Sequence, residues 1–296
     1  MSELVVGIQG SRGAFHERAA YQMFGSDVNI EYIPAFDELF ATLRAGEIGT
    51  AVAAIANVDI GFIDEPHDEL VERGEQDYWI TAETYVPVAH QLLGLPGATL
   101  EQITTVHSMS PALRQCSHTL RKIGPHFHYV EESDTAFSAE LVRELGDPSH
   151  AAVASQRAGK LNGLETIESD VHDSDKNMTR FLSIKRRADG LEQMDGSEDK
   201  STVLLVTPES KGALYRALEP FDSEGINIDT LHSSFVQDSY FDAQFFMEFE
   251  AGLRSSQTKK VLEALRILGC DVKELGSYHK QPIPMMSTGA SEKATK

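Results

Sequence analysis

The chain has 296 residues, 41% of them hydrophobic, and its 46 acidic residues against 26 basic ones give a formal net charge of −20. This length favours two domains over one, and the negative charge argues against nucleic acid and anionic membranes as partners. The two cysteines, Cys116 and Cys270, lie far apart and form neither a disulfide framework nor a zinc signature.

The amino-terminal stretch MSELVVGIQG has no basic segment followed by a long apolar run, so we expect no signal peptide. No apolar run in the sequence reaches the roughly 20 residues that a bilayer-spanning helix needs. We therefore expect a cytoplasmic protein with no membrane partner.

Strands and helices are predicted to alternate along the first part of the chain. The apolar pattern predicts extended segments at Leu4–Ile8, Ile30–Ile33, Thr50–Ile55, Ile80–Leu95, Ile103–Val106, His128–Val130 and Ala151–Ala154. Caps and glycine stops predict helices from Phe15 to Gly25, at Phe36–Ala45, from Ser110 to Ile123, from Asp134 to Leu145 and from Ser155 to Leu161. This alternation predicts an α/β domain with mainly parallel sheet at residues 1–185.

A charged stretch without apolar periodicity, RRADGLEQMDGSEDK, is predicted to be a linker at residues 186–200. After it the predicted elements are Ser201–Thr207, Gly212–Glu224, Ile226–Phe235, Tyr240–Glu250, Ser256–Leu268 and Asp271–Tyr278. Their order, βαββαβ, matches a ferredoxin-like unit at residues 201–279. Within it we expect Pro220 to kink its helix or end it early, and a turn at Gln237-Asp238-Ser239. Residues 280–296 are predicted to be a flexible polar tail.

The turn Gly10-Ser11-Arg12-Gly13 lies between a predicted strand and a predicted helix. Such a turn can present backbone N–H groups and the positive end of a helix to an anion. More often, such a turn is simply a tight connection between a strand and a helix, with no ligand bound. It is neither GxGxxG nor a P-loop, so it does not imply a nucleotide.

Three polar residues stand where α/β domains place ligands. Asn57 follows the buried strand Thr50–Ile55, at the carboxyl end of a strand. Ser108 precedes the helix that starts at Ser110, and Gln115 lies in its first turns. Taken alone, Ser108 and Gln115 are better explained as a helix cap and a solvated glutamine, and the position of Asn57 is only suggestive, so each is a candidate that needs support from the others.

Thr179-Arg180 stands directly before Phe181, the first residue of an apolar strand end. Arginine offers a planar fork that matches a carboxylate, and threonine offers a compact donor and acceptor. An exposed strand start with a surface arginine explains the pair equally well. The histidines have no HExxH or HxH spacing, and no Ser-His-Asp order or glycine-elbow nucleophile is visible, so we expect no metal and no cofactor.

From about Val5 to Tyr278 the chain resembles prephenate dehydratase with a C-terminal ACT regulatory domain. The resemblance is carried by IQGSRGAFHERAA, VHSMSPALRQC, AAVASQRAGKLNGLETI, NMTRF and GALYRALEPFDSEGINI. NMTRF is the most specific segment, because Thr-Arg-Phe is the catalytic signature of that family. The resemblance implies a two-subdomain, periplasmic-binding-protein-like catalytic domain followed by an ACT domain.

The resemblance implies that the chain converts prephenate to phenylpyruvate, water and CO2 in phenylalanine biosynthesis. The catalytic residues that it implies are Asn57, Ser108, Gln115, Thr179, Arg180 and Phe181. From the anion-binding turn described above, Gly10, Arg12 and Gly13 are the candidates for substrate binding. Thr179 would serve the leaving ring hydroxyl and Arg180 a substrate carboxylate. Prephenate is a dianion whose loss of hydroxyl and CO2 yields an aromatic ring, so the reaction needs a donor, carboxylate-binding groups and exclusion of water.

Two segments depart from the family pattern. Where the family has Glu-Asn-Ser/Thr, this chain has Ala56-Asn57-Val58, and where the family has Ser-His-Pro it has Ser108-Met109-Ser110. These changes remove a carboxylate, a hydroxyl and a histidine from the expected pocket. They bear on the rate and on the identity of the product.

The resemblance also implies phenylalanine as an effector between the ACT domains of two chains, and hence a homodimer or homotetramer. The effector residues that it implies are Gly212, Ala213, Leu214, Asn227, His232 and Ser233. The second effector motif, Glu-Ser-Arg-Pro in many members, is here His232-Ser233-Ser234-Phe235, which keeps the serine alone.

Two alternatives to the dehydratase remain open at the level of the sequence. A decarboxylase would act on prephenate without forming the aromatic ring; Thr179 with Arg180 argues against it, because Thr179 serves the departing hydroxyl. A non-catalytic protein would sense an amino acid through its ACT domain beside a decayed pocket. Ala56 and Met109 favour that alternative, whereas the retained Asn57, Ser108, Gln115 and Thr179 oppose it.

Overall fold

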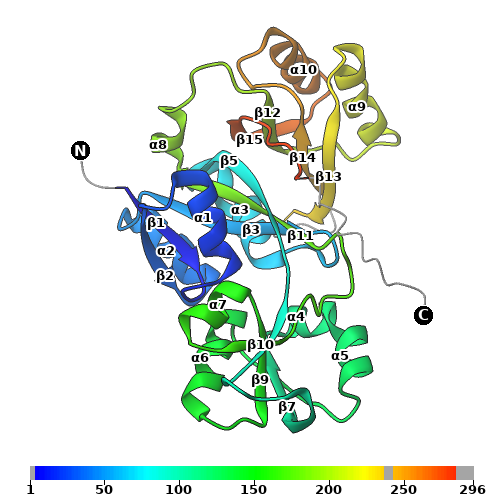
Figure 1. Ribbon diagram of the computed structural model, residues 1–296. Coiled ribbons are helices and arrows are strands. Elements are labelled where there is room, and N and C mark those ends of the chain that lie inside the picture. The colour runs from blue at the N-terminus through cyan, green and yellow to red at the C-terminus, as the bar shows by residue number, and fades with distance from the viewer. Residues whose placement is uncertain (1–3, 237–242, 285–296) are drawn as a thin grey trace. The chain divides into compact units, whose positions relative to one another are not determined.

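The computed structural model describes residues 4–236 and 243–284 and divides into two compact units (Figure 1). The first unit comprises the described residues within Met1–Ala56, Phe62–Thr84 and Arg180–Gln281. The second unit comprises the described residues within Asn57–Gly61, Tyr85–Thr179 and Pro282–Lys296. The predicted turn Gln237-Asp238-Ser239 lies outside the described residues. Within the described ranges, no helix has the length and apolar character that a membrane span requires.

The first unit is built on one large mixed sheet. Its strands are β1 (Val5–Gln9), β2 (Asn29–Ile33), β3 (Thr50–Asn57), β4 (Gly61–Phe62), β5 (Tyr78–Pro87), β11 (Met178–Arg186), β12 (Lys200–Val206), β13 (Ile228–Phe235), β14 (Ala243–Phe249) and β15 (Asp271–Tyr278). The order is β13-β14-β12-β15-β5-β11-β3-β1-β2, with β4 paired to β3. Strand β1 is parallel to β2 and β3, whereas β12 is antiparallel to β14 and β15. The predicted α/β class is confirmed, with mixed sheets.

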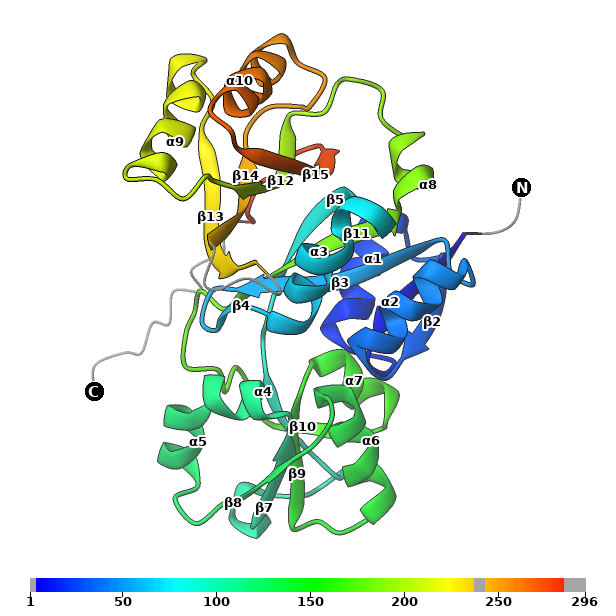
Figure 2. The same ribbon diagram turned by 180° about the vertical axis from the view of Figure 1, so that it is seen from behind.

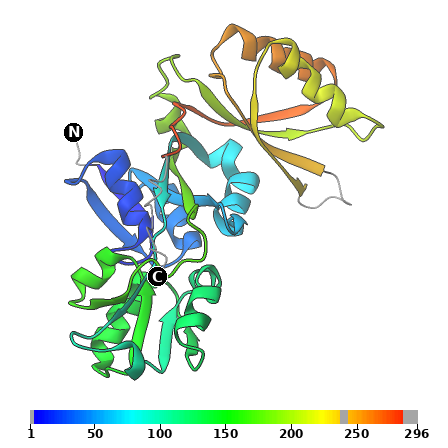
Figure 3. The same ribbon diagram turned by 45° about the vertical axis from the view of Figure 1, so that its right-hand side comes forward.

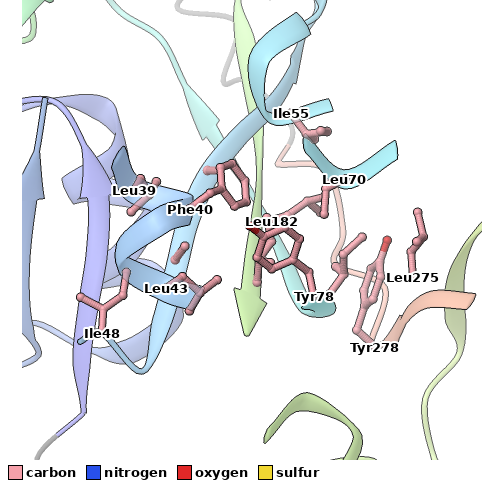
Figure 4. Packing of buried hydrophobic residues seen from close by; sticks show 14 of the residues in the cluster. Leu39, Phe40, Leu43, Ile48, Ile55, Leu70, Tyr78, Leu182, Leu275 and Tyr278 are labelled. Atoms are coloured by element: carbon pink, nitrogen blue, oxygen red, sulfur yellow. The ribbon is translucent and has the colours of Figure 1, made fainter. Parts of the chain in front are cut away.

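Six helices accompany this sheet in the described part of the first unit: α1 (Phe15–Phe24), α2 (Phe36–Ala45), α3 (Asp64–Asp77), α8 (Arg187–Leu191), α9 (Ala213–Ser223) and α10 (Ser256–Ile267). Helix α2 has the predicted limits and buries Leu39, Phe40 and Leu43, which lie on one face of a 3.6-residue period. It ends at Gly46, whose left-handed φ of 77° suits glycine. Figure 4 shows these side chains packed in a core with Leu182 of β11.

The carboxyl-terminal part of the first unit has the predicted βαββαβ order. We call β12 to β15 with α9 and α10 the C-terminal module. Its strand order, β13-β14-β12-β15, is ferredoxin-like, and Figure 3 shows α9 and α10 on one face of these strands. The core between them includes Val203, Phe221 and Val261. Helix α9 continues past Pro220 to Ser223, so the early end that Pro220 predicted does not occur.

The second unit has a five-stranded sheet with helices on both faces (Figure 2). Its strands are β6 (Gln91–Gly94), β7 (Thr105–Ser108), β8 (His128–Glu131), β9 (His150–Ala154) and β10 (Glu165–Glu168), in the order β10-β6-β9-β7-β8. Its helices are α4 (Ser110–Gln115), α5 (Ser117–Ile123), α6 (Thr135–Leu145), α7 (Gln156–Leu161) and the short 3-10 helix Leu100–Gln102. Asp134 and Ser155 cap α6 and α7 as predicted. The predicted helix Ser110–Ile123 is wrong in one respect, because Cys116 leaves helical geometry and divides it.

Several segments differ from what the sequence pattern indicated. Helix α3 and strand β10 were not predicted, and α8 lies within the stretch predicted as a linker. Lys280 and Gln281, which were predicted to begin a flexible tail, are tied to the first unit. Their backbone N–H groups donate to Asp199 at 2.6 Å and to Glu83 at 3.1 Å. The rest of that tail, from residue 285, lies outside the described residues.

Candidate active site

A hydrogen-bond network in the second unit joins three of the predicted site residues. Asn57 is the last residue of β3, Gln115 is the last residue of α4, and Thr179 is the second residue of β11. The network adds Asn177, two residues before Thr179, and His90, one residue before β6. Since side chains two apart in an extended chain point to the same side, Asn177 and Thr179 can both reach Asn57.

Asn57 lies at the centre of this network. Its Nδ2 donates to Thr179 Oγ1 at 2.8 Å and to Asn177 Oδ1 at 2.8 Å. Gln115 Nε2 donates to Asn57 Oδ1 at 3.1 Å, and His90 Nε2 lies 3.0 Å from Gln115 Oε1. Asn57, Thr179, Asn177 and His90 are all buried, whereas Gln115 is half-buried.

The direction of these hydrogen bonds is set by one backbone group. The N–H of Asp59 can only donate, and it lies 2.9 Å from Asn57 Oδ1. This contact fixes which end of the Asn57 amide is the oxygen, so Nδ2 must face Thr179 and Asn177. Gln115 must then present its N–H to Asn57 and its oxygen to His90.

His90 completes the chain as a donor. Because Gln115 Oε1 can only accept, the ring nitrogen that faces it, Nε2, carries a hydrogen. Burial lowers the pKa of His90 to about 4, and its contact with Gln115 opposes this without cancelling it. The imidazole is therefore uncharged at neutral pH.

The network leaves the hydroxyl hydrogen of Thr179 available for a further hydrogen bond. The side chain of Asn57 makes four hydrogen bonds, which use both of its N–H groups and both lone pairs of its oxygen. Thr179 Oγ1 accepts one of them, so within the described part of the chain its hydroxyl hydrogen is left available to donate. Asn177 Nδ2 is likewise a buried donor that meets no acceptor among the described residues. A buried donor that stays unpaired lowers the stability of the fold by about 1–3 kcal/mol. Unpaired buried donors of this kind are typical of functional sites.

Ser108 is buried in the second unit but lies outside this network. Its hydroxyl donates to the carbonyl of Val153 at 2.7 Å, which commits its hydrogen to the backbone. Of the three departures beside the candidate residues, Ala56 and Met109 each pack against a hydrophobic core, and Val58 is 64% exposed. The backbone N–H of Val58 donates to the carbonyl of Met178 at 3.0 Å, next to Thr179.

Arg180 and Phe181 lie in the first unit and have other partners. The guanidinium of Arg180 donates to Glu83 at 2.8 Å and, through two nitrogens, to both carboxylate oxygens of Glu248 at 2.6 Å. Phe181 is 1% exposed, and its ring forms a T-shaped pair with the His16 ring, with 5.0 Å between the ring centroids. Thus Arg180 already holds two carboxylates of the protein, and Phe181 is a core residue.

The turn Gly10-Ser11-Arg12-Gly13 also has an internal partner. The N–H of Gly10 donates to the carbonyl of Ile33 at 2.8 Å, and the N–H of Gly13 donates to the Glu17 carboxylate at 3.0 Å. Glu17 is fully buried and accepts hydrogen bonds from Tyr32 at 2.7 Å and from Tyr21 at 3.2 Å. The anion at this turn is therefore a side chain of the protein, while Arg12 is exposed.

The predicted effector residues all lie in or beside the C-terminal module: Gly212, Ala213, Leu214, Asn227, His232 and Ser233. Gly212 precedes α9 with a left-handed φ of 73°. Asn227 donates to Glu250 at 3.0 Å, and the ring of His232 stacks on Phe62 at 4.2 Å. Asn227 and His232 therefore turn to different partners, and Ser233 is exposed.

Sequence reasoning missed His90 and Asn177. Asn177 could have been found, because it precedes Thr179 by one strand period within the same short motif. No sequence signal marks His90, which reaches Gln115 through the fold of the second unit. In the described part of the chain, no group of three or more histidine, cysteine, aspartate or glutamate side chains is arranged to hold a metal ion.

Comparison with known proteins gives a consistent assignment over most of the chain. Residues 6–189 match the family model of prephenate dehydratase. A bifunctional N-acyl-homoserine lactone acylase/prephenate dehydratase from Komagataeibacter europaeus is 31% identical over 95% of this chain and 97% of its own length. A chloroplastic arogenate dehydratase/prephenate dehydratase from Arabidopsis thaliana is 30% identical over 94% of this chain and 72% of its own length.

A solved structure extends the similarity to the fold. The crystal structure of a prephenate dehydratase from Arthrobacter aurescens in complex with L-Phe is 27% identical and has a TM-score of 0.81. The similarity covers 95% of this chain and 93% of that protein.

Proposed function

The chain belongs to the prephenate dehydratase family, and we propose that it converts prephenate to phenylpyruvate, water and CO2. One observation carries the proposal: Asn57 Nδ2 donates to Thr179 Oγ1, so the threonine hydrogen is directed away from Asn57. A hydroxyl held in this way donates to the ring hydroxyl of the substrate as that group departs. Formation of the aromatic ring supplies the driving force, so a strong acid is unnecessary.

Some residues of the network contact the substrate, and others hold those residues in position. Thr179 and the second N–H of Gln115 are the groups that we assign to the substrate, because each keeps hydrogen-bonding capacity that no described residue uses. Asn57 is saturated and holds Thr179 in position. Positioned donors of this kind accelerate proton transfer by about 100- to 10,000-fold.

The roles that were predicted for Arg180 and for the Gly10–Gly13 turn stay predictions. A substrate carboxylate can bind Arg180 only if it displaces Glu83 or Glu248. Similarly, the N–H of Gly13 is available only if Glu17 moves. The proposal therefore rests on the second-unit network alone.

We further propose that the C-terminal module is an ACT domain that binds phenylalanine between two chains, in a cytoplasmic homodimer or homotetramer. Its ferredoxin-like strand order supports this, as does the relative that was crystallised with L-Phe. The loss of the Glu-Ser-Arg-Pro motif, and the stacking of His232 on Phe62, make the effector the part of the proposal that most needs a test.

A second activity deserves an assay because of a specific observation. The relative from Komagataeibacter europaeus, similar over 97% of its own length, carries an acylase activity in its name. Hydrolysis of N-acyl-homoserine lactones is therefore the second candidate. The Arabidopsis relative adds arogenate as a candidate substrate in place of prephenate.

Product identification tests the proposal directly. The full-length protein is incubated with prephenate, and the product is followed by phenylpyruvate absorbance in alkali and by mass. Phenylpyruvate supports the proposal; a non-aromatic decarboxylated acid would indicate the decarboxylase; unchanged prephenate would indicate a sensor. Parallel reactions with arogenate and with an N-acyl-homoserine lactone test the other substrates, and added phenylalanine tests the effector.

A further inference from the structure

A buried charge network surrounds Arg180 in the first unit. Its other charged members are Glu83 of β5, Glu248 of β14 and Lys200 of β12, so that two of its four charged members come from the C-terminal module. All four residues are buried, and Glu248 is 0% exposed. Tyr278 completes the set, with its hydroxyl 3.0 Å from Glu248 and 3.1 Å from Arg180.

The contacts are those of a tightly built site. Two guanidinium nitrogens of Arg180 lie 2.6 Å from the two oxygens of Glu248, the paired geometry that suits arginine and a carboxylate. Glu83 lies 2.7 Å from the Nη2 of Arg180 and 3.0 Å from Lys200. The bidentate contact fixes both the distance and the plane of the Arg180 side chain.

The cations in this network are fully paired. Two buried carboxylates, Glu83 and Glu248, face two buried cations, Arg180 and Lys200, and Lys200 also lies 3.2 Å from Asp229. Burial raises the pKa of Glu248, but the adjacent Arg180 outweighs it and lowers the pKa to about 2. Glu248 is therefore ionised at neutral pH, and Arg180 keeps no excess charge for a dianionic substrate.

Arg180 directly follows Thr179 in β11. We infer that Glu248 is a positioning residue: by holding Arg180 it fixes the backbone of β11 at Thr179, so that the C-terminal module takes part in the reaction of its own chain. The inference rests on the proposed function, because the positioned group is the Thr179 hydroxyl. It assigns Arg180 to the support of Thr179 and not to a substrate carboxylate.

The two roles of Arg180 predict different kinetics. If Arg180 positions Thr179 through Glu248, then loss of either partner lowers kcat and leaves KM nearly unchanged. If Arg180 binds the substrate instead, its loss raises KM, whereas loss of Glu248 removes one of the two carboxylates that hold the guanidinium and does not weaken binding. Displacement of a reacting group by about 1 Å can cost about 100-fold in rate.

The experiment measures kcat and KM of the full-length protein with prephenate for Arg180→Met, Glu248→Gln and Arg180→Met/Glu248→Met. The double variant removes one cation and one carboxylate together, so it avoids an unpaired buried charge and remains folded if a single variant does not. We expect kcat of each variant to fall by about 10- to 100-fold, with KM within about twofold of the wild-type value. The double variant should lose no more kcat than either single variant. Glu224→Gln, which removes an exposed ion pair with Lys260, is the control and should keep kcat.

Two results would overturn the inference: variants that keep the kcat of the wild type, or a KM that rises more than about tenfold for Arg180→Met alone. If the wild type forms no phenylpyruvate, the proposed function fails first, and hydrogen exchange of the peptide that contains Thr179 then decides the inference. Faster exchange in the double variant than in Glu224→Gln supports positioning through Glu248, and unchanged exchange overturns it.

Discussion

At the scale of single residues, the backbone N–H of Asp59 determines what Thr179 can do. It orients the amide of Asn57, and that amide in turn makes Thr179 an acceptor towards the protein and a donor towards the opposite side. If the Asn57 amide were reversed, its oxygen would face Thr179, and its N–H group would face the N–H of Asp59, donor against donor. The chemistry of the site thus depends on a direction as well as on a set of residues.

The direction can be tested by Asn57→Asp, which replaces the N–H donor with a second acceptor. The Thr179 hydrogen would then turn towards the new carboxylate and be lost to the substrate. We expect kcat to fall by about 100-fold with a small change in KM, measured by phenylpyruvate formation. Asn162→Asp makes the same change at a half-buried asparagine at the end of α7 and should leave kcat unaltered. A wild-type kcat in Asn57→Asp would contradict the assigned direction.

His90 provides a test through pH. Burial lowers its pKa from 6.5 in the unfolded chain to about 4 in the fold, so the unfolded state binds more protons between these values. Stability is therefore fully present above pH 6.5 and is lost as the pH falls towards 4. Between about pH 7.5 and about pH 5, this one group should remove about 2 kcal/mol from the free energy of unfolding.

Urea unfolding at several pH values measures this effect. His90→Gln keeps a donor for Gln115 and should lose about 2 kcal/mol less than the wild type over that interval. His128→Gln, at an exposed histidine of the same unit, is the control. Equal losses in the wild type and in His90→Gln would show that the fold does not lower the pKa of His90.

Sequence reasoning named three residues that share one hydrogen-bond network, but it did not predict their contacts. Thr179, Asn57 and Gln115 were predicted from the family motif, and the structure places them in one network. Ser108 was predicted with them but gives its hydrogen to a backbone carbonyl. Such a bond depends on the register of two strands in space, which no motif encodes.

At the scale of the elements, local signals were reliable where a cap or a stop was present. Helix α6 begins after Asp134, whose side chain accepts from two backbone N–H groups. Helix α3 escaped prediction because its buried positions include Pro66, His67 and Gly74, which form no apolar stripe. Gly74 packs against Leu275 of the C-terminal module, a contact that the sequence of the helix cannot reveal.

The junction between β15 and β5 offers a prediction at this scale. Gly276 pairs with Ile80, and a methyl group at Gly276 would lie 2.5 Å from the Ile80 carbonyl oxygen. Because the paired backbone of Ile80 cannot move without a large cost in free energy, we expect Gly276→Ala to lower the free energy of unfolding by about 1–3 kcal/mol. Urea unfolding measures this change. Gly49→Ala meets the flexible end of Leu4 at 2.8 Å and should cost less. Equal costs would contradict the close pairing of β15 with β5.

At the scale of the whole molecule, the predicted two-part chain is organised differently in space. The C-terminal module belongs to the same compact unit as the amino-terminal strands, and Leu204, Phe246 and Tyr278 share a core with Leu39 and Leu43 of α2. Figure 4 shows Tyr278 and Leu275 beside Tyr78 in this core. A linker predicted from composition implies separable domains. How the chain divides into compact units depends instead on contacts between residues that are far apart in the sequence.

The net charge of −20 gives a prediction for the binding of a dianion. Arg180 is neutralised by Glu83 and Glu248, so the long-range field of the protein repels prephenate. Salt screens such a field over about 10 Å at 0.1 M, and KM for prephenate should therefore fall severalfold as NaCl is raised from about 0.02 M to about 0.5 M. KCl in place of NaCl controls for specific ion effects. A KM that rises with salt would indicate a local cationic site that dominates the field.

The central claim is that the Thr179 hydroxyl donates to the departing hydroxyl of the substrate. Its most direct test is the comparison of kcat for Thr179→Val and Thr179→Ser at saturating prephenate, with Thr81→Val, a half-buried threonine of β5, as the control. We predict that Thr179→Val loses about 100-fold or more in kcat with little change in KM, while Thr179→Ser retains most of the activity. A Thr179→Val variant that keeps its kcat, or that loses kcat and substrate binding equally, would contradict the claim.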